Sequence, residues 1–138
     1  MNKNTHLSEI MTTNLVVANK NNSLSQLAQF FTNFGVHHIP VTDGSVPIGI
    51  VSVSDLVRFI SAKMTENKFL SLTTLEQDFK IESIMTNVVF TLSKNDTVKK
   101  ALETLSESGF QSLLITENGN LVGLVTLKDL VRFTNNNW

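Results

Sequence analysis

The chain has 138 residues, of which 41% are hydrophobic, so it carries enough apolar side chain to form the core of a folded domain. Eleven basic and twelve acidic residues leave a formal net charge of −1. A near-neutral chain lacks the positive field that binding to duplex nucleic acid requires, and we do not expect that class of partner.

Residue types that are missing or scarce exclude several further kinds of site. The sequence has no cysteine, which excludes a disulfide scaffold, a thiolate zinc site and a thiol nucleophile. Its histidines, at positions 6, 37 and 38, do not have the spacing of a metal site or of an acid–base pair, so we expect neither a metal nor catalysis. No apolar run approaches the ~20 residues of a membrane span, and residues 1–6 lack the apolar core of a signal peptide. We therefore expect a cytoplasmic protein with no membrane partner.

The most informative feature of the sequence is an internal repeat. Shifted by 74 residues, positions 10–60 align with 84–134 without a gap, and 14 of the 51 aligned positions are identical. The matches include Ile-Met-Thr at 10–12 and 84–86, glycines at 35 and 109 and at 49 and 123, and Asp-Leu-Val-Arg-Phe at 55–59 and 129–133. A five-residue block and two glycines in one register indicate a duplicated unit.

Each copy predicts the same element order, β-α-β-β-α. The first copy predicts a strand at Leu15–Val17, a helix at Leu24–Phe34, strands at Val36–Thr42 and Pro47–Val51, and a helix at Val53–Lys63. The second copy predicts a strand at Val88–Phe90, a helix from Asp96-Thr97 to Gly109, strands at Ser112–Thr116 and Leu121–Val125, and a helix at Leu127–Thr134.

Local signals support these boundaries. Ser23, with Gln26 three residues later, is typical of a capping box, and Gly35 fits a left-handed helix end. The connections 43–45 and 117–120 contain glycine, as hairpin loops do. A copy of about 50 residues is only marginally stable alone because it buries too little surface, so we expect the two to pack together.

The boundaries of the copies follow from the same alignment. We expect a first repeat at 1–64 with its core at 10–60, a linker at 65–80, and a second repeat at 81–138 with its core at 84–134. The segment between the copies contains Phe69, Leu70, Leu72 and Leu75. It is too apolar for a free linker, and we expect it to pack onto the rest of the chain.

These landmarks resemble the CBS domain, named after cystathionine β-synthase, and two copies resemble a CBS pair, or Bateman module. They are Ile-Met-Thr, a capped helix ending in Gly, an apolar strand with Pro, and Gly-hydrophobic-Val-Ser/Thr-x-x-Asp. The resemblance implies a mixed α/β (α+β) fold of two β-α-β-β-α repeats related by pseudo-two-fold symmetry, packed through their sheets. It also implies two clefts between the repeats that bind adenine nucleotides or S-adenosylmethionine, and association into a homodimer.

The candidate sites are the turns Gly49–Asp55 and Gly123–Asp129, where a strand leads into a helix. Ser or Thr there can cap the helix, the helix N-terminus favours a phosphate, and the Asp carboxylate complements a ribose diol. The resemblance places the ribose at the Asp and the phosphate near the Ser or Thr. We expect exposed aspartates here, and ribose and phosphate contacts from Ser52, Ser54, Asp55, Thr126, Lys128 and Asp129. The alternative is that both turns are plain capping boxes without a ligand.

The resemblance also implies contacts to the base and to the phosphates from the segments that open each copy and from the strand that follows its first helix. The corresponding residues are Thr12, Asn14, Leu15, His37, His38, Ile39, Pro40, Thr86, Val88, Val89, Ser112 and Leu113. Strand alternation predicts one histidine of the pair inward and the other outward. Arg58 and Arg132 lie three residues after the motif Asp, where an ion pair within the helix explains them, and we leave them out of the site.

The sequence therefore predicts a non-catalytic regulatory module that binds AMP, ADP, ATP or S-adenosylmethionine and signals through altered module or dimer geometry. No cofactor is required, and the receiver of the signal is the dimer or a separate effector protein. The alternative is a structural or dimerisation module that interacts with a partner protein and binds no ligand.

Overall fold

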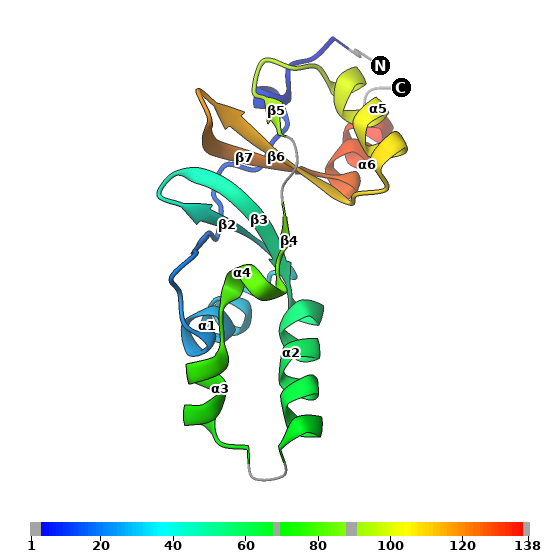
Figure 1. Cartoon of the computed structure of the whole chain (residues 1–138). Helices are drawn as coiled ribbons and strands as arrows, with labels where there is room; N and C mark the ends of the chain where they lie inside the picture. Colours follow the sequence, from blue (N-terminus) through cyan, green and yellow to red (C-terminus); the bar gives the residue numbers. More distant parts are fainter. Residues whose placement is uncertain (1–3, 68–69, 88–90, 137–138) are drawn as a thin grey trace. The chain divides into compact units, whose positions relative to one another are not determined.

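The computed structural model describes residues 4–67, 70–87 and 91–136, and it divides into two compact units (Figure 1). One unit contains residues 16–88, and the other contains residues 1–15 together with 89–138. We call them the first-repeat unit and the second-repeat unit, after the repeat that supplies the body of each.

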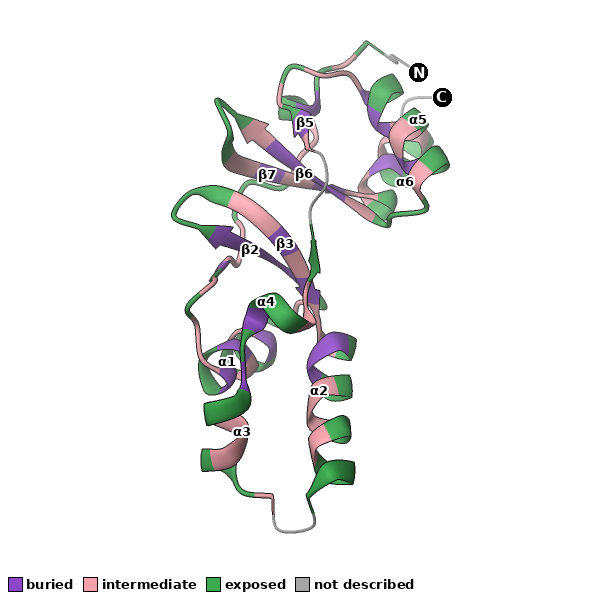
Figure 2. Cartoon of the chain, in the orientation of Figure 1, coloured by how far each residue is buried: buried purple, intermediate pink, exposed green. Residues whose placement is uncertain are grey.

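The first-repeat unit is built around a four-stranded sheet with the order β1-β2-β3-β4. Its elements are β1 (Ala18–Asn19), α1 (Leu24–Phe34), β2 (His38–Asp43), β3 (Val46–Ser52), α2 (Val53–Glu66), α3 (Leu72–Asp78), α4 (Ile81–Ile84) and β4 (Thr86–Asn87). Strand β1 pairs parallel to β2, and the β2–β3 and β3–β4 pairs are antiparallel. Buried residues of β2 and β3 pack with α1, α2 and α4 to form its core (Figure 2).

The second-repeat unit repeats this plan around a three-stranded sheet with the order β5-β6-β7. Its elements are the 3-10 helix η1 (Leu7–Glu9), β5 (Leu92–Ser93), α5 (Val98–Ser108), β6 (Ser112–Glu117), β7 (Asn120–Thr126) and α6 (Leu127–Asn136). Strand β5 pairs parallel to β6, and β6 pairs antiparallel to β7. The predicted β-α-β-β-α order and the mixed α+β class are thus confirmed.

The predicted helix ends are confirmed as well. Ser23 accepts a hydrogen bond from the Gln26 N–H, and the Gln26 side chain accepts one from the Ser23 N–H, which completes the capping box. Thr97 caps α5 with a single bond, which its hydroxyl accepts from the Lys100 N–H. Helices α1 and α5 both end at a glycine in the left-handed region, where a side chain would be strained.

The first strand of each copy differs from the prediction. Residues 15–17 are not a strand; the strand is the two-residue β1, which begins one residue later. A strand forms only where the partner backbone is in register, and the pairing with β2 starts at Ala18 opposite Val41. The predicted strand at 88–90 lies outside the described residues, and β5 forms at Leu92–Ser93.

The opening segment of each repeat belongs to the unit of the other repeat. Thr12 and Leu124 exchange two backbone hydrogen bonds of 2.9 and 3.0 Å, which adds the opening segment of the first repeat to β7 of the second. Likewise β4, which opens the second repeat, pairs with β3 of the first. Leu7 and its counterpart Ile81 are both fully buried, each in the unit of the other repeat.

Two glycines allow the opening segment of each repeat to come close to the sheet of the other repeat. A Cβ at Gly123 would lie 2.4 Å from the Met11 sulfur, and one at Gly49 would lie 2.5 Å from the Met85 sulfur. The two positions differ in one respect: the Gly49 Cβ would also lie 2.7 Å from the backbone oxygen of Thr86. A flexible thioether can move aside, whereas a paired backbone carbonyl cannot.

The segment between the repeats packs onto the first-repeat unit, as expected. Phe79 is buried in its core, and Leu75 of α3 packs against that core. Of the other apolar residues of this segment, Leu70 is half-buried, Leu72 is exposed, and Phe69 lies outside the described residues. The Glu76 carboxylate accepts hydrogen bonds from the Leu24 N–H at 3.1 Å, the Ser25 N–H at 2.9 Å and the Ser25 hydroxyl. Helix α3 therefore supplies a negative charge to the N-terminus of α1, a position that the helix dipole favours.

We expect Gly49→Ala to destabilise the protein more than Gly123→Ala, within the range of about 1–3 kcal/mol typical of overpacking. Denaturant unfolding of both variants, alone and combined with Met85→Ala or Met11→Ala, measures the difference. Truncating Met11 should remove most of the cost at Gly123, whereas truncating Met85 should leave most of the cost at Gly49. Equal costs at both glycines in all backgrounds would contradict the assignment of the Thr86 carbonyl.

Glu76 should make stability depend on pH at the acid end. Hydrogen bonding from Ser25 lowers the pKa of Glu76 below its ordinary value of 4.5. A lowered pKa stabilises the folded state fully above the ordinary value, and this contribution is lost as the pH falls below it. Glu76→Gln should therefore lower stability at neutral pH by less than about 1 kcal/mol, and by less still near pH 3. Thermal unfolding across pH, with the exposed Gln77→Ala as the control, measures this; a loss that does not change with pH would contradict it.

Candidate functional site

In the first-repeat unit, the candidate site is the turn from β3 into α2. The Ser52 hydroxyl accepts from the Asp55 N–H at 3.0 Å, and Asp55 Oδ2 accepts from the Ser52 N–H at 2.8 Å. The Val53 N–H donates to the His37 carbonyl at 3.1 Å, which ties the turn to the start of β2. The turn is thus a complete capping box, and it positions the Asp55 carboxylate at the N-terminus of the helix.

The second-repeat unit repeats this geometry at the turn from β7 into α6. Asp129 Oδ2 accepts from the Thr126 N–H at 2.9 Å, and the Thr126 hydroxyl accepts from the Asp129 N–H at 3.1 Å. The Leu127 N–H donates to the Gln111 carbonyl at 2.9 Å. The capping function that the sequence left open is therefore present in both copies, and in each it uses one oxygen of the aspartate.

The second oxygen of each aspartate faces an arginine of the same helix. Arg58 makes a direct hydrogen bond to Asp55 Oδ1, whereas Arg132 Nη1 lies 3.8 Å from Asp129 Oδ1, too far for a hydrogen bond. The predicted ion pairs at three-residue spacing are both confirmed. The arginine side chains are 72% and 64% exposed, whereas those of the aspartates are only 10% and 18% exposed, so each pair joins a surface arginine to a largely buried carboxylate.

The expectation of an exposed aspartate is wrong for Asp55, which is only 9% exposed. The carboxylate accepts hydrogen bonds from the Ser52 N–H and from Arg58. These bonds compensate its burial, because a buried charge is tolerated when it is paired. Asp129 is half-buried. Replacing either residue with alanine therefore removes part of the helix cap as well as a candidate ligand contact.

The histidine pair also differs from the expectation, because His37 and His38 are both exposed. His37 precedes β2, and His38 is its first residue, paired with Ser52, so strand alternation does not yet apply. Burial begins at Ile39. Both residues therefore adjoin the Ser52–Asp55 turn through the backbone, and both are exposed to solvent.

The remaining predicted residues are divided between the two units by the exchange of opening segments. Thr12 and Asn14 are exposed and lie in the unit of the Asp129 turn, where Thr12 pairs with β7 two residues before Thr126. Leu15 ends that segment, half-buried. Thr86 lies in the unit of the Asp55 turn, paired with Ile50 of β3. No local pattern in the sequence indicates that each opening segment joins the turn of the other copy.

The last group of predicted residues follows the first helix of each copy. Ile39 and Leu113 are buried in the two cores, and Pro40 is buried, while Ser112 is half-buried and pairs with Thr126. Ser54 and Lys128, in the first turns of α2 and α6, are exposed. Val88 and Val89 lie outside the described residues.

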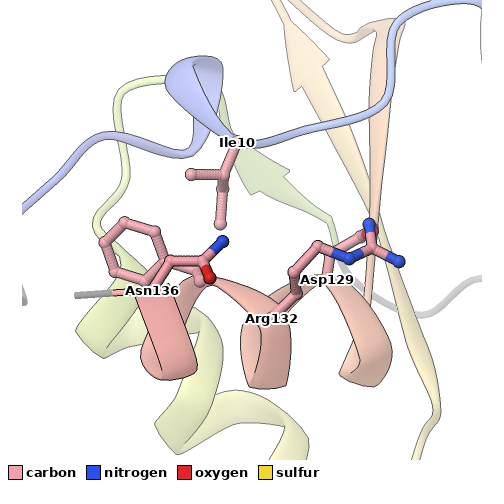
Figure 3. Close-up of a pocket in the computed structure, with 5 residues that line it drawn as sticks. Ile10, Asp129, Arg132 and Asn136 are labelled. Atoms are coloured by element: carbon pink, nitrogen blue, oxygen red, sulfur yellow. The ribbon is translucent and has the colours of Figure 1, made fainter. Parts of the chain in front are cut away.

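Beside the second turn lies a hollow of about 190 Å³, lined by Ile10, Asp129, Arg132, Phe133 and Asn136 (Figure 3). We call it the α6 hollow. Figure 3 shows Ile10 pointing from the opening segment toward α6, from which Asp129, Arg132 and Asn136 project. The sequence prediction named only Asp129 of this set; the spacing of 129, 132, 133 and 136 on one helical face is the signal that could have found the others.

We expect Asp55→Ala to lower the free energy of unfolding by about 1–2 kcal/mol and Asp129→Ala by about 1 kcal/mol, because each loses a charged acceptor of the helix cap. Ser54→Ala, at an exposed position between the two cap residues, should change stability by less than about 0.5 kcal/mol. Denaturant unfolding compares the three. Aspartate variants as stable as Ser54→Ala would show that the capping bonds contribute nothing.

Two classes of site are not found in the described part of the chain. No group of three or more His, Cys, Asp or Glu side chains there could hold a metal ion. None of the helices described is both long and apolar enough to cross a bilayer.

Comparison with known proteins places this fold. The protein MJ1225 of Methanocaldococcus jannaschii is 24% identical over 131 residues, covering 94% of this chain and 43% of that protein. The chain thus spans less than half the length of this curated relative. Among solved structures, CBSX2 in complex with AMP superposes with a TM-score of 0.74 at 20% identity, covering 95% of this chain and 96% of that one.

A second solved structure has a similar fold. The CBS domain pair of MJ0100, in complex with 5′-methylthioadenosine and S-adenosyl-L-methionine, gives a TM-score of 0.75 at 20% identity, covering 97% of this chain and 98% of the other. The sequence profile of the CBS domain matches residues 7–62 and 81–136, which include both repeats. The chain therefore belongs to the CBS domain family and carries two CBS domains in tandem.

Proposed function

We propose that the chain is a regulatory module without catalytic activity that binds an adenosine-containing ligand at its two strand–helix turns. One observation carries the proposal. In both units the aspartate of a capping box lies at a helix N-terminus, beside an exposed segment from the other repeat. The solved complexes of CBSX2 with AMP and of the MJ0100 pair with 5′-methylthioadenosine and S-adenosyl-L-methionine support this ligand class.

The capped aspartate can take a ribose without losing its cap. Oδ2 of Asp55 and of Asp129 is used by the cap, and Oδ1 faces an arginine. Both arginine side chains are largely exposed, so each can leave Oδ1 for water while a ribose hydroxyl takes its place and keeps the carboxylate hydrogen-bonded. In this proposal the cap orients the carboxylate, and the arginine remains available to a phosphate.

The two turns are suited to ligands of different charge. The first turn of α6 carries Lys128, where α2 carries Ser54, and a lysine beside a helix N-terminus favours an anionic ligand. The α2 turn instead lies beside the exposed His37 and His38. The imidazole N–H groups of these histidines can donate hydrogen bonds to a phosphate, so this turn would hold an anion by hydrogen bonding rather than through a lysine.

A bound ligand can regulate only through a difference in affinity between two conformations of the module. Each turn lies in a unit that contains the opening segment of the other repeat, so a ligand contacts both repeats through one unit. We propose that the preferred conformation is read as altered module geometry, by a homodimer partner or by a separate effector protein.

The second candidate function is a ligand-free interaction module, and one observation favours it. Helices α2 and α6 expose apolar residues at corresponding positions, Val57 and Val131, and add Met64 and Leu127. Exposed apolar side chains that recur on matched helices are typical of a surface that a protein partner covers. Under this reading the two aspartates act only as helix caps.

A thermal-shift panel separates the two functions. We expect one or more of AMP, ADP, ATP, S-adenosylmethionine and adenosine to raise Tm by several degrees, since a ligand at a hundred times its Kd adds about 2.7 kcal/mol. GTP is the specificity control. Asp55→Asn and Asp129→Asn keep an acceptor for the cap, and each should weaken binding at its own turn by about tenfold.

The double variant should lose the shift while keeping a cooperative melt. A flat panel with folded wild-type protein would contradict the ligand proposal and favour the interaction module. An unchanged shift in the double variant would overturn the assignment of the ribose to the aspartates.

A further inference from the structure

Met11 and Met85 occupy the same position in the two repeats, just after the short helix of each opening segment. The Met11 N–H donates to the Leu7 carbonyl at 2.9 Å, and the Met85 N–H donates to the Ile81 carbonyl at 3.1 Å. Leu7 and Ile81 are the fully buried residues of these segments. The residue that follows each methionine is paired with a strand of the other repeat. Each methionine therefore links the buried part of its segment to the paired part.

Each methionine sulfur lies against a glycine of that strand. A Cβ at Gly123 would meet Sδ and Cγ of Met11 at 2.4 and 2.9 Å, and a Cβ at Gly49 would meet Sδ and Cγ of Met85 at 2.5 and 2.9 Å. Both methionines also pack against the apolar core of the unit that they complete. The two thioethers thus occupy the space that a side chain at each glycine would need.

Both methionines remain within reach of a small oxidant. Each is half-buried, and the threonine that follows each is exposed. A thioether sulfur is oxidised without first losing a proton, in contrast to a thiol. The sequence has no cysteine, so no thiol competes for the oxidant. The methionines are therefore the sulfur groups of this chain that a peroxide meets.

We propose that Met11 and Met85 are sites of reversible oxidation by hydrogen peroxide, which releases the opening segment of one repeat from the strand of the other. A lone pair of the thioether sulfur attacks one oxygen of the peroxide, the O–O bond breaks, and an S–O bond forms. The displaced hydroxide takes the proton of the transferred oxygen and leaves as water. Sulfur is oxidised by two electrons to the sulfoxide, and the same two electrons reduce the peroxide.

The sulfoxide does not suit the packed position, because its oxygen is polar and requires a hydrogen-bond donor. The N–H groups of Thr12 and Leu124, where the two segments meet beside Met11, donate to each other's carbonyl oxygens. The Met11 N–H is used by Leu7. A polar oxygen buried without a donor costs free energy. The oxidised side chain therefore turns to water, leaves the glycine uncovered and weakens the pairing beside it.

The expected consequence is local opening rather than unfolding of the whole chain. Thr12 and Leu124 are held together by two backbone hydrogen bonds, and Thr12 is exposed. Short, exposed pairings of this kind open at lower free energy than the strands and helices of a core. The inference does not rest on the proposed function, because it concerns the exchanged segments and requires no ligand at the aspartate turns.

The test is stepwise oxidation of the full chain with dilute hydrogen peroxide. Mass spectrometry measures the sulfoxide at each methionine, and hydrogen exchange measures the opening of the backbone. We expect Met64, which is 63% exposed, to be oxidised first without changing exchange in either opening segment. Oxidation of Met11 should speed amide exchange at Thr12 and Leu124 by about tenfold or more, and oxidation of Met85 should do the same in β4.

Methionine-to-leucine variants assign the effect, because leucine has a similar volume and forms no sulfoxide. Met11→Leu should abolish the peroxide response at Thr12 and Leu124 but keep the response in β4, and Met85→Leu should do the reverse. Met64→Leu is the matched control and should keep both responses. Methionine sulfoxide reductases for both epimers, with a dithiol, should restore slow exchange: the dithiol becomes a disulfide, the sulfoxide oxygen leaves as water, and the thioether is regenerated.

Three outcomes would overturn the proposal. If Met11 and Met85 stay reduced while Met64 is fully oxidised, the packed thioethers are not modification sites. If both are oxidised and exchange does not change, the sulfoxide is tolerated beside the glycine. If the response persists in the double variant Met11→Leu, Met85→Leu, it belongs to another group of the chain.

Discussion

The rest of the structure depends on a close contact between a methionine and a glycine that is made twice. Met11 packs over Gly123 and Met85 over Gly49, and in each case the two residues come from different repeats. The contact docks the opening segment of one repeat on the hairpin of the other and places Leu7 or Ile81 in a core that its own repeat does not form. Neither repeat completes its sheet and core from its own residues, which gives a physical reason for the tandem arrangement of two units that would each be marginal alone.

The parts of the fold that the sequence predicts are those fixed by neighbouring residues. The capping box at Ser23, the left-handed glycines and the hairpins depend on interactions within a few positions, and all are confirmed. The exchange of opening segments depends on pairing between residues about 110 positions apart for Thr12 and Leu124, and no local pattern encodes such a partner. The same reason explains the first strand, which forms where β2 meets it rather than where the apolar run lies.

The candidate site also has features that depend on neighbouring residues and features that depend on distant ones. The aspartate turns could be predicted, because Ser52–Asp55 and Thr126–Asp129 are short motifs whose hydrogen bonds are local. Their surroundings could not, since the burial of Asp55 depends on Arg58 and the exposure of both histidines depends on where β2 begins. The α6 hollow is lined by Ile10 together with residues of α6, and no local pattern indicates that segments so far apart in the sequence meet.

The exchange also bears on how an occupied turn could affect the rest of the chain. Thr12 is bonded to Leu124, two residues before the Thr126 cap, and the chain passes from Leu15 into the first-repeat unit three residues later. A ligand that prefers one position of the Thr126–Asp129 turn therefore acts on a segment that continues along the chain into β1 and α1. Coupling requires an element with two positions that a ligand binds unequally, and the exchanged segment is the element that both repeats share. If each repeat paired with its own opening segment, a ligand bound to one repeat would not contact a segment that continues into the other.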